Sequence, residues 1–117
     1  MNSTRGTVLG ECVRVADTSV TRMVGLLGER ELGAGDGLLI VPSQGIHTWG
    51  MRFPIDVVVL DDDWNTIAVR RAMRPFRMTR IFLKAAAVLE LPAGTVDSTS
   101  TAVGDVIEFN SVNPASA

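Results

Sequence analysis

Residues 55–60, with the sequence IDVVVL, decide the fold, because five of the six are apolar. A run that is apolar on both faces is typical of a strand at the centre of a sheet. Asp56 shares a face with Val58, so its carboxylate enters an apolar layer and needs a partner. We expect Arg52 to supply that partner, because a guanidinium and a carboxylate pair through two hydrogen bonds.

Further short strands are expected on both sides of this run, where apolar segments alternate with turn residues. Seven segments predict strands, namely residues 7–15, 37–41, 46–51, 55–61, 66–71, 86–91 and 106–110. A possible N-cap at Ser19, followed by apolar residues at helical spacing, predicts one helix of about two to three turns. The expected fold class is α+β and mostly β, a small partly closed barrel of about seven short strands with one short helix packed on it.

The length and composition limit the classes of protein to which the chain can belong. A chain of 117 residues, 46% of them hydrophobic, suits one globular domain over residues 1–117, with a core at about 7–110 and a frayed tail at 111–117. No apolar run approaches the roughly 20 residues of a membrane span, and the first residues lack the apolar stretch of an export signal, so we expect a cytoplasmic protein. With one Cys and one His, we expect neither a structural metal nor another cofactor.

The charges are distributed unevenly. A formal net charge of −2 argues against a nucleic-acid partner. Residues 70–84, however, carry six of the eleven cations and no acid. The default reading is a solvated loop, but four arginines recur at every third residue with apolar side chains between them and are candidates for binding an anion or a partner. These are Arg71, Arg74, Arg77 and Arg80.

The densest group of polar side chains lies in residues 47–56, HTWGMRFPID. Together with Glu90, which shares a strand face with Val88, this segment supplies the candidates for ligand binding. They are His47, Trp49, Met51, Arg52, Asp56 and Glu90. Each has a structural alternative: His47 can be hydrogen-bonded near a strand end, and the two acids can hold loops by accepting backbone N–H groups.

Five pieces of sequence occur in the order typical of one family: RMVGLL at 22–27, GLLI at 37–40, the 47–56 segment, VLELPAG at 88–94 and Gly104-Asp105. On these motifs the chain resembles the bacterial and archaeal family called domain of unknown function 192. The resemblance implies a small barrel-like β domain without an established activity, whose members are often exported. It also implies shared polar positions at Met51, Asp56, Glu90 and Asp105, with His47, Trp49 and Arg52 matching one branch of the family.

One departure from the family lies in the turn after residue 60. Trp64-Asn65 stands where the family usually has Gly, and Asn65 tolerates the left-handed backbone that the turn needs.

Two classes of function follow. The favoured one is a non-catalytic accessory domain that binds a small polar or anionic ligand or a protein partner, because no nucleophile or phosphate-loop motif is evident. The alternative is a hydrolase or lyase in which Asp56 and Glu90 act as an acid–base pair with His47. The second class requires these three side chains to converge on one side of the fold, which we state as a prediction.

Overall fold

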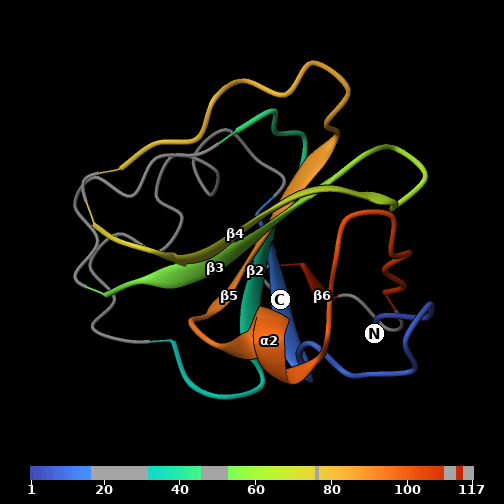
Figure 1. Ribbon diagram of the computed structural model, residues 1–117, viewed down its shortest axis with the longest axis vertical. Coiled ribbons are helices and arrows are strands. Elements are labelled where there is room, and N and C mark those ends of the chain that lie inside the picture. Colours follow the sequence, from blue (N-terminus) through green and yellow to red (C-terminus); the bar gives the residue numbers. More distant parts are fainter. Residues whose placement is uncertain (17–31, 46–52, 76, 110–112, 115–117) are drawn as a thin grey trace.

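A computed structural model describes residues 1–16, 32–45, 53–75, 77–109 and 113–114. Its strands form one mixed sheet in the order β4-β3-β5-β2-β1-β6, which Figure 1 shows strongly twisted. The β1/β2 and β1/β6 pairs are parallel and the other pairs are antiparallel. The elements are β1 (Cys12–Ala16), β2 (Asp36–Ile40), β3 (Ile55–Leu60), β4 (Thr66–Met73), β5 (Ala87–Pro92), the helix α2 (Thr95–Ser98) and β6 (Asn113–Pro114).

The prediction of a central strand is confirmed. All six residues of β3 are buried, and β3 lies between β4 and β5. The predicted hairpin partner is also confirmed, since β4 pairs antiparallel with β3. β4 continues to Met73, two residues beyond the predicted strand at 66–71, and Arg70 and Arg71 lie within it.

The fold is mostly β, but the described strands do not form the expected barrel. The sheet is open, with β4 at one end and the two-residue β6 at the other. Where a strand is predicted at 106–110, the described residues 106–109 form isolated bridges at Val106 and Ile107. The short helix α2 comes from a Ser/Thr-rich stretch without apolar periodicity, whereas the helix predicted from Ser19 and the strand predicted at 46–51 lie outside the described residues. In the part of the chain that is described, no helix is long and apolar enough to cross a membrane.

Two layers of apolar side chains cover the two faces of the sheet. On the face that we call the Phe82 face, Val57 and Val59 of β3 pack with Val88 of β5 and with Phe82 from the segment after β4. The opposite face, which we call the Val96 face, carries the alternate residues of the same strands, packed against Val96 of α2 and against Ile107. Its buried members are Leu9, Val15, Leu39, Val58, Leu60, Ala87, Leu89, Leu91, Val96 and Ile107.

Both ends of the described chain are tied to the body of the fold. Asn2 is fully buried, and its Nδ2 donates to Thr101 Oγ1 (3.1 Å) and to Asp105 Oδ2 (2.9 Å). Asn2 is therefore part of the packed body of the described chain. Near the other end, β6 falls within the stretch for which fraying is predicted, and it pairs with β1.

The turn between β3 and β4 places Trp64, not Asn65, in the left-handed region, with φ 64°. Asp61 organises the turn, because its Oδ1 accepts the N–H groups of Asp63 (3.0 Å) and Asn65 (2.8 Å). The Trp64 ring packs on the Val96 face and meets the Phe109 ring at 5.0 Å between centroids. Packing of the ring offsets the steric cost of this backbone conformation, which is on the order of 1 kcal/mol.

Candidate functional site

Asp56 is a buried carboxylate on the Val96 face with backbone partners. It is 1% exposed, and its Oδ1 accepts the N–H of Ala72 (2.8 Å). Its Oδ2 accepts the N–H groups of Gly94 (3.0 Å) and Val96 (2.8 Å). Three backbone donors therefore satisfy the side chain, as in the structural alternative stated for it above.

These hydrogen bonds join three elements. Ala72 has φ 47° and lies where the β3/β4 register shifts between Ile55 and Val57, so Asp56 holds an irregular end of β4. Gly94 precedes α2 with φ 97°, a conformation that suits glycine. Asp56 thus fixes β4 and the start of α2 to the central strand.

Glu90 is also buried, but its surroundings differ. It is 3% exposed, and its Oε2 has no hydrogen-bond partner among the described residues. In the sheet it lies between Leu38 of β2 and Val57 of β3. Burial raises the pKa of the Glu90 carboxyl from 4.5 to about 7, because loss of water disfavours the charged form.

The two acids do not converge. Asp56 lies opposite Leu91 and Glu90 lies opposite Val57, so the two side chains project from opposite faces of the sheet. The prediction that both acids meet His47 on one side of the fold is therefore wrong for Asp56 and Glu90. The prediction rests on the central positions of both strands. A difference of one residue in register, however, moves a side chain to the opposite face of the sheet.

Four further candidates, His47, Trp49, Met51 and Arg52, lie outside the described residues. Their assignment as ligand-binding residues, and the pairing of Arg52 with Asp56, stay predictions.

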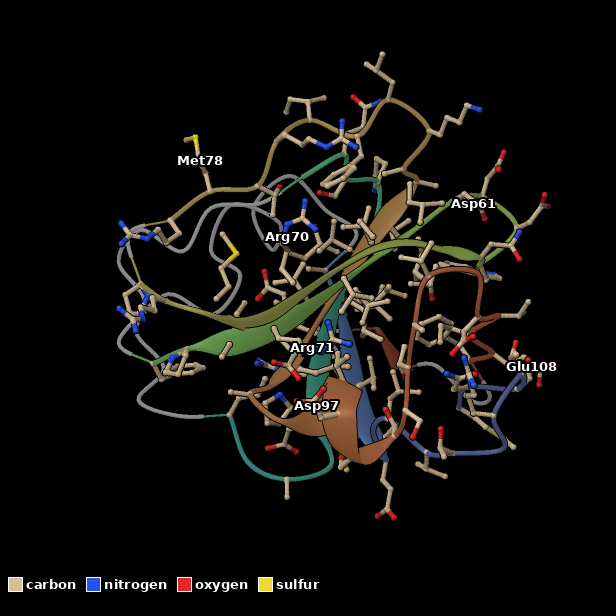
Figure 2. All side chains as sticks on the ribbon, in the orientation of Figure 1. Asp61, Arg70, Arg71, Met78, Asp97 and Glu108 are labelled. Carbon is tan, nitrogen blue, oxygen red and sulfur yellow. The ribbon has the colours of Figure 1, made fainter. Side chains whose placement is uncertain are left out.

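The structure separates the four predicted anion-binding arginines. The Arg71 Nε donates to Asp97 Oδ1 of α2 at 2.8 Å, and both side chains are exposed; Figure 2 shows the two side by side. Arg74 and Arg77 follow β4 as exposed residues. Arg80 lies over the Phe82 ring, with its guanidinium carbon 4.5 Å from the ring centroid.

Arg70 is a cation outside the set of anion-binding arginines predicted from the sequence. Its guanidinium carbon lies 5.5 Å from the centroid of the same Phe82 ring, so one aromatic ring carries two guanidinium groups. The three-residue spacing that singled out the other arginines excludes Arg70. The sequence feature that identifies Arg70 is the alternation of side chains along a strand, which puts it on the Phe82 face beside Val57.

These residues line a cavity of about 330 Å³ along β4. Three arginines contribute, and no carboxylate does. Among the described residues, Arg70 and Arg80 have no ion-pair partner, and the only hydrogen bond of Arg70 runs from Nη1 to the carbonyl oxygen of Val69 (3.0 Å). The lining consists of Ile67, Ala68, Val69, Arg70, Arg71, Arg80, Phe82, Ala102 and Val103.

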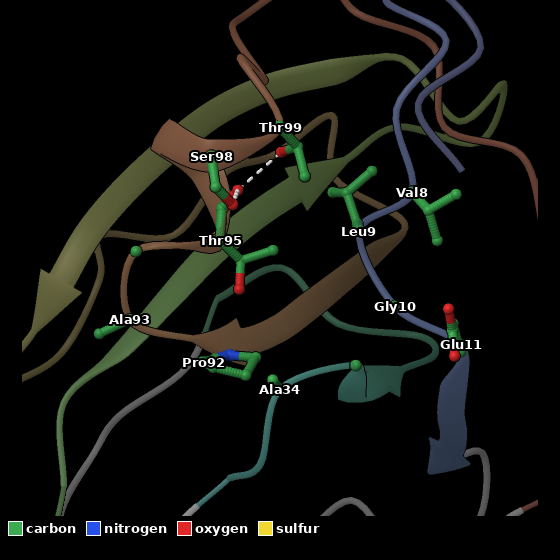
Figure 3. A pocket seen from close by; sticks show the side chains of 12 residues that line it. Val8, Leu9, Gly10, Glu11, Ala34, Pro92, Ala93, Thr95, Ser98 and Thr99 are labelled. Carbon is green, nitrogen blue, oxygen red and sulfur yellow. Dashed lines mark hydrogen bonds between the residues drawn. The ribbon is translucent and has the colours of Figure 1, made fainter.

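A second cavity, of about 610 Å³, lies between the segment before β1, the loop before β2 and the start of α2 (Figure 3). Two of its three hydroxyl groups are engaged locally, since Ser98 Oγ and Thr99 Oγ1 both donate to the carbonyl oxygen of Thr95. Glu11, which is exposed, is the only charged residue in its lining. This cavity offers less specific chemistry than the arginine-lined one.

Asp105 is another buried acid, and it acts in a structural network. Burial tends to raise the pKa of Asp105, but the hydrogen bonds from Asn2, Arg5 and the N–H of Ala102, together with the charge of Arg5, outweigh burial and lower that pKa below 3.8. The Arg5 Nε lies 3.0 Å from Asp105 Oδ2. In the described part of the chain, no three His, Cys, Asp or Glu side chains form a group that could hold a metal ion.

Fold and site together define a small open-sheet β domain with a cationic cavity at one edge. The chain belongs to the DUF192 family, described as "Uncharacterized ACR", whose model matches residues 2–109. A UPF0127 protein of Thermococcus sibiricus is 31% identical over 114 residues, which is 93% of this chain and 73% of the relative. The family resemblance drawn from the motifs is therefore confirmed.

Two solved structures share the fold. A protein of unknown function from Novosphingobium aromaticivorans matches with a TM-score of 0.75 and 21% identity, over 83% of this chain and 74% of its own. A Sinorhizobium meliloti protein matches with a TM-score of 0.72 and 24% identity, over 82% of this chain and 79% of its own. At these identities the likeness concerns the fold alone.

Proposed function

We propose that this protein is a non-catalytic binding domain whose ligand or partner carries negative charge. One observation carries the proposal: Arg70 and Arg80 share the Phe82 ring, line one cavity with Arg71, and have no carboxylate partner among the described residues. Two unpaired guanidinium groups held close together repel each other, and an anion between them relieves that repulsion.

The guanidinium group suits this role. It stays charged at all physiological pH values and presents several N–H donors in one plane. The Arg80 guanidinium lies over the Phe82 ring, and its N–H groups can donate to a carboxylate or a phosphate.

The buried acids support binding more than acid–base chemistry. Both oxygens of Asp56 accept backbone N–H groups, and Glu90 lies on the opposite face of the sheet. Further candidate contacts of the ligand are His47, Trp49, Met51, Arg52 and Glu90.

The test is a thermal-unfolding assay with anions of increasing charge, namely chloride, phosphate, pyrophosphate and citrate, at constant ionic strength. A ligand that binds only the native state and is present at 100 times its Kd stabilises that state by about 2.7 kcal/mol. For a domain of this size, such a gain raises the unfolding midpoint by several degrees. We expect Arg80→Gln to abolish the shift.

Lys84→Gln is the matched control, because it removes one exposed cation from the same segment but outside the cavity lining. It should keep the full shift. The proposal fails if the multivalent anions do not shift the wild-type midpoint or if both variants lose the shift equally.

A further inference from the structure

The outer side of β4 is an exposed strand edge. β4 ends the sheet, with β3 on one side and no described strand on the other. Five consecutive residues of β4, residues 67–71, line the arginine-lined cavity. Because successive side chains of a strand point to opposite faces, a cavity that touches all five runs along the edge of the strand and not over one face.

Fixed contacts limit the accessible part of this edge. At the start of β4, the N–H of Thr66 donates to the carbonyl oxygen of Asp105 and the N–H of Gly104 donates to that of Thr66, both at 2.8 Å. At the far end, the strand becomes irregular at Ala72, which has φ 47° and whose N–H donates to Asp56 of β3. Residues 67–71 between them span about 17 Å of extended chain, which matches a strand of ordinary length.

Positive charge flanks this stretch on both faces of the sheet. Arg70 lies opposite Val57 and contacts Phe82, so it projects from the Phe82 face together with Arg80. Arg71 is the next residue along the strand and reaches Asp97 of α2, on the Val96 face. Figure 2 shows Arg70 and Arg71 on opposite sides of β4.

We infer that residues 67–71 bind an extended acidic peptide segment as an additional strand, an inference that rests on the proposed function. The main chain of the peptide pairs with the outer edge of β4, as in other cases of strand addition. Two adjacent acidic residues of the peptide alternate between the faces, so that one meets Arg70 and Arg80 while the next meets Arg71. Cross-strand side chains of opposite charge lie close enough to attract each other in this arrangement.

Other occupants fit these observations less well. A free small anion engages the guanidinium groups but not the strand edge between them. A nucleic acid presents charge along a long backbone, whereas this chain has a net charge of −2 and the arginine-lined cavity follows only five residues of β4, two of them arginines. Charged edge residues also protect sheets from aggregation. That role does not require two guanidinium groups to share one aromatic ring, as Arg70 and Arg80 do.

The experiment measures fluorescence anisotropy with labelled hexapeptides and the full chain. The first peptide has two adjacent glutamates between valine and threonine residues, the second replaces both glutamates by glutamine, and the third carries N-methyl groups that block main-chain pairing. We expect the first to bind, and the second and third to bind at least about tenfold more weakly, since each loses charge pairs or ladder hydrogen bonds.

Protein variants locate the site. Arg70→Gln with Arg80→Gln should weaken binding of the first peptide about tenfold, and Lys84→Gln should leave the affinity unchanged. Asp97→Asn should strengthen binding by a factor of about two to three, because it releases Arg71 from its exposed ion pair. Amide hydrogen exchange should slow within residues 67–71 when the peptide is bound.

The outcomes separate the two proposals. If pyrophosphate binds and N-methylation does not weaken the peptide, the anion site stands and strand addition is overturned. If neither peptide nor anion binds, both proposals fall. A single-stranded oligonucleotide that displaces the peptide and binds more tightly overturns the inference in favour of a nucleic acid.

Discussion

Asp56 and Glu90 are both nearly fully buried and stand on adjacent strands, yet their surroundings differ completely. Asp56 accepts three backbone N–H groups on the Val96 face. Glu90 projects from the Phe82 face between Leu38 and Val57, and no described residue forms a hydrogen bond with its Oε2. Burial alone therefore does not say what a carboxylate does.

The difference has an energetic meaning. A buried carboxylate with three donors stabilises the segments that carry those donors. A buried carboxylate without donors costs stability whenever it is charged, and it avoids this cost by keeping its proton. The hydrogen bonds of Asp56 thus support the fold, whereas the charged form of Glu90 opposes it.

The largest expected effect tests the first half of this contrast. Asp56→Ala removes the acceptor for three N–H groups, two of them at the start of α2 and one at the irregular end of β4. We expect a loss of about 3 to 5 kcal/mol in the free energy of unfolding, measured by urea denaturation.

Asp61→Ala is the matched control, because Asp61 also accepts three hydrogen bonds but lies in a partly exposed turn. Water can replace its lost contacts, so we expect a loss of about 1 kcal/mol. Equal losses for Asp56→Ala and Asp61→Ala would contradict the structural role assigned to Asp56.

The second prediction concerns Glu90 and pH. The folded protein holds the Glu90 proton up to a pKa of about 7, against 4.5 as its ordinary value. The folded state thus binds more protons than the unfolded state between these values, so stability falls as the pH rises from 4.5 to 7. The gap corresponds to roughly 3 kcal/mol.

Glu90→Gln removes the titrating group. Urea denaturation of both proteins across this pH range should give nearly equal stabilities at pH 4 and a variant that is more stable by about 2 to 3 kcal/mol at pH 8. If the difference between the two proteins does not change with pH, Glu90 does not titrate in the way that its burial implies.

Asp105 should show the opposite sign. Its folded pKa lies below 3.8, so its contribution is present above that value and is lost as the pH falls through the folded pKa. Asp105→Asn should cost on the order of 1 to 2 kcal/mol at pH 7, because it weakens the contacts with Asn2, Arg5 and Ala102. The cost should shrink toward pH 2, as followed by urea denaturation, and a cost that grows in acid would contradict this assignment.

Much of the sheet follows from local sequence. Residues 55–60 are apolar on both faces, and the central β3 results. The hairpin to β4 follows from turn residues between two such runs. What local pattern does not supply is closure: whether a set of strands forms a barrel or an open sheet depends on the pairing of its first and last strands, which are distant in the sequence.

The site was harder to predict for the same reason. The sequence identifies Asp56 and Glu90 as buried acids, but their opposite faces depend on the registers of β3 and β5. Likewise, a spacing of three residues predicts Arg74 and Arg77 as anion-binding residues, whereas Arg70 lines the cavity at β4. The reason is that side chains of a strand alternate between the two faces of the sheet. Phe82 becomes recognisable only when the segment after β4 folds back over the sheet.

The smallest expected effect completes the comparison with an exposed carboxylate. Asp97 lies in α2, the same helix whose first N–H groups Asp56 holds, and pairs with Arg71 across solvent. Because both partners are well exposed, water and salt screen the pair, and a double-mutant cycle with Asp97→Asn and Arg71→Gln should give a coupling of about 0.3 to 0.5 kcal/mol. Repeating the cycle at high salt should reduce the coupling toward zero, while the cost of Asp56→Ala stays large. A coupling above about 1 kcal/mol that resists salt would mean that α2 is fixed by its exposed pair as well as by Asp56, and that Arg71 is not free to exchange Asp97 for an acidic peptide.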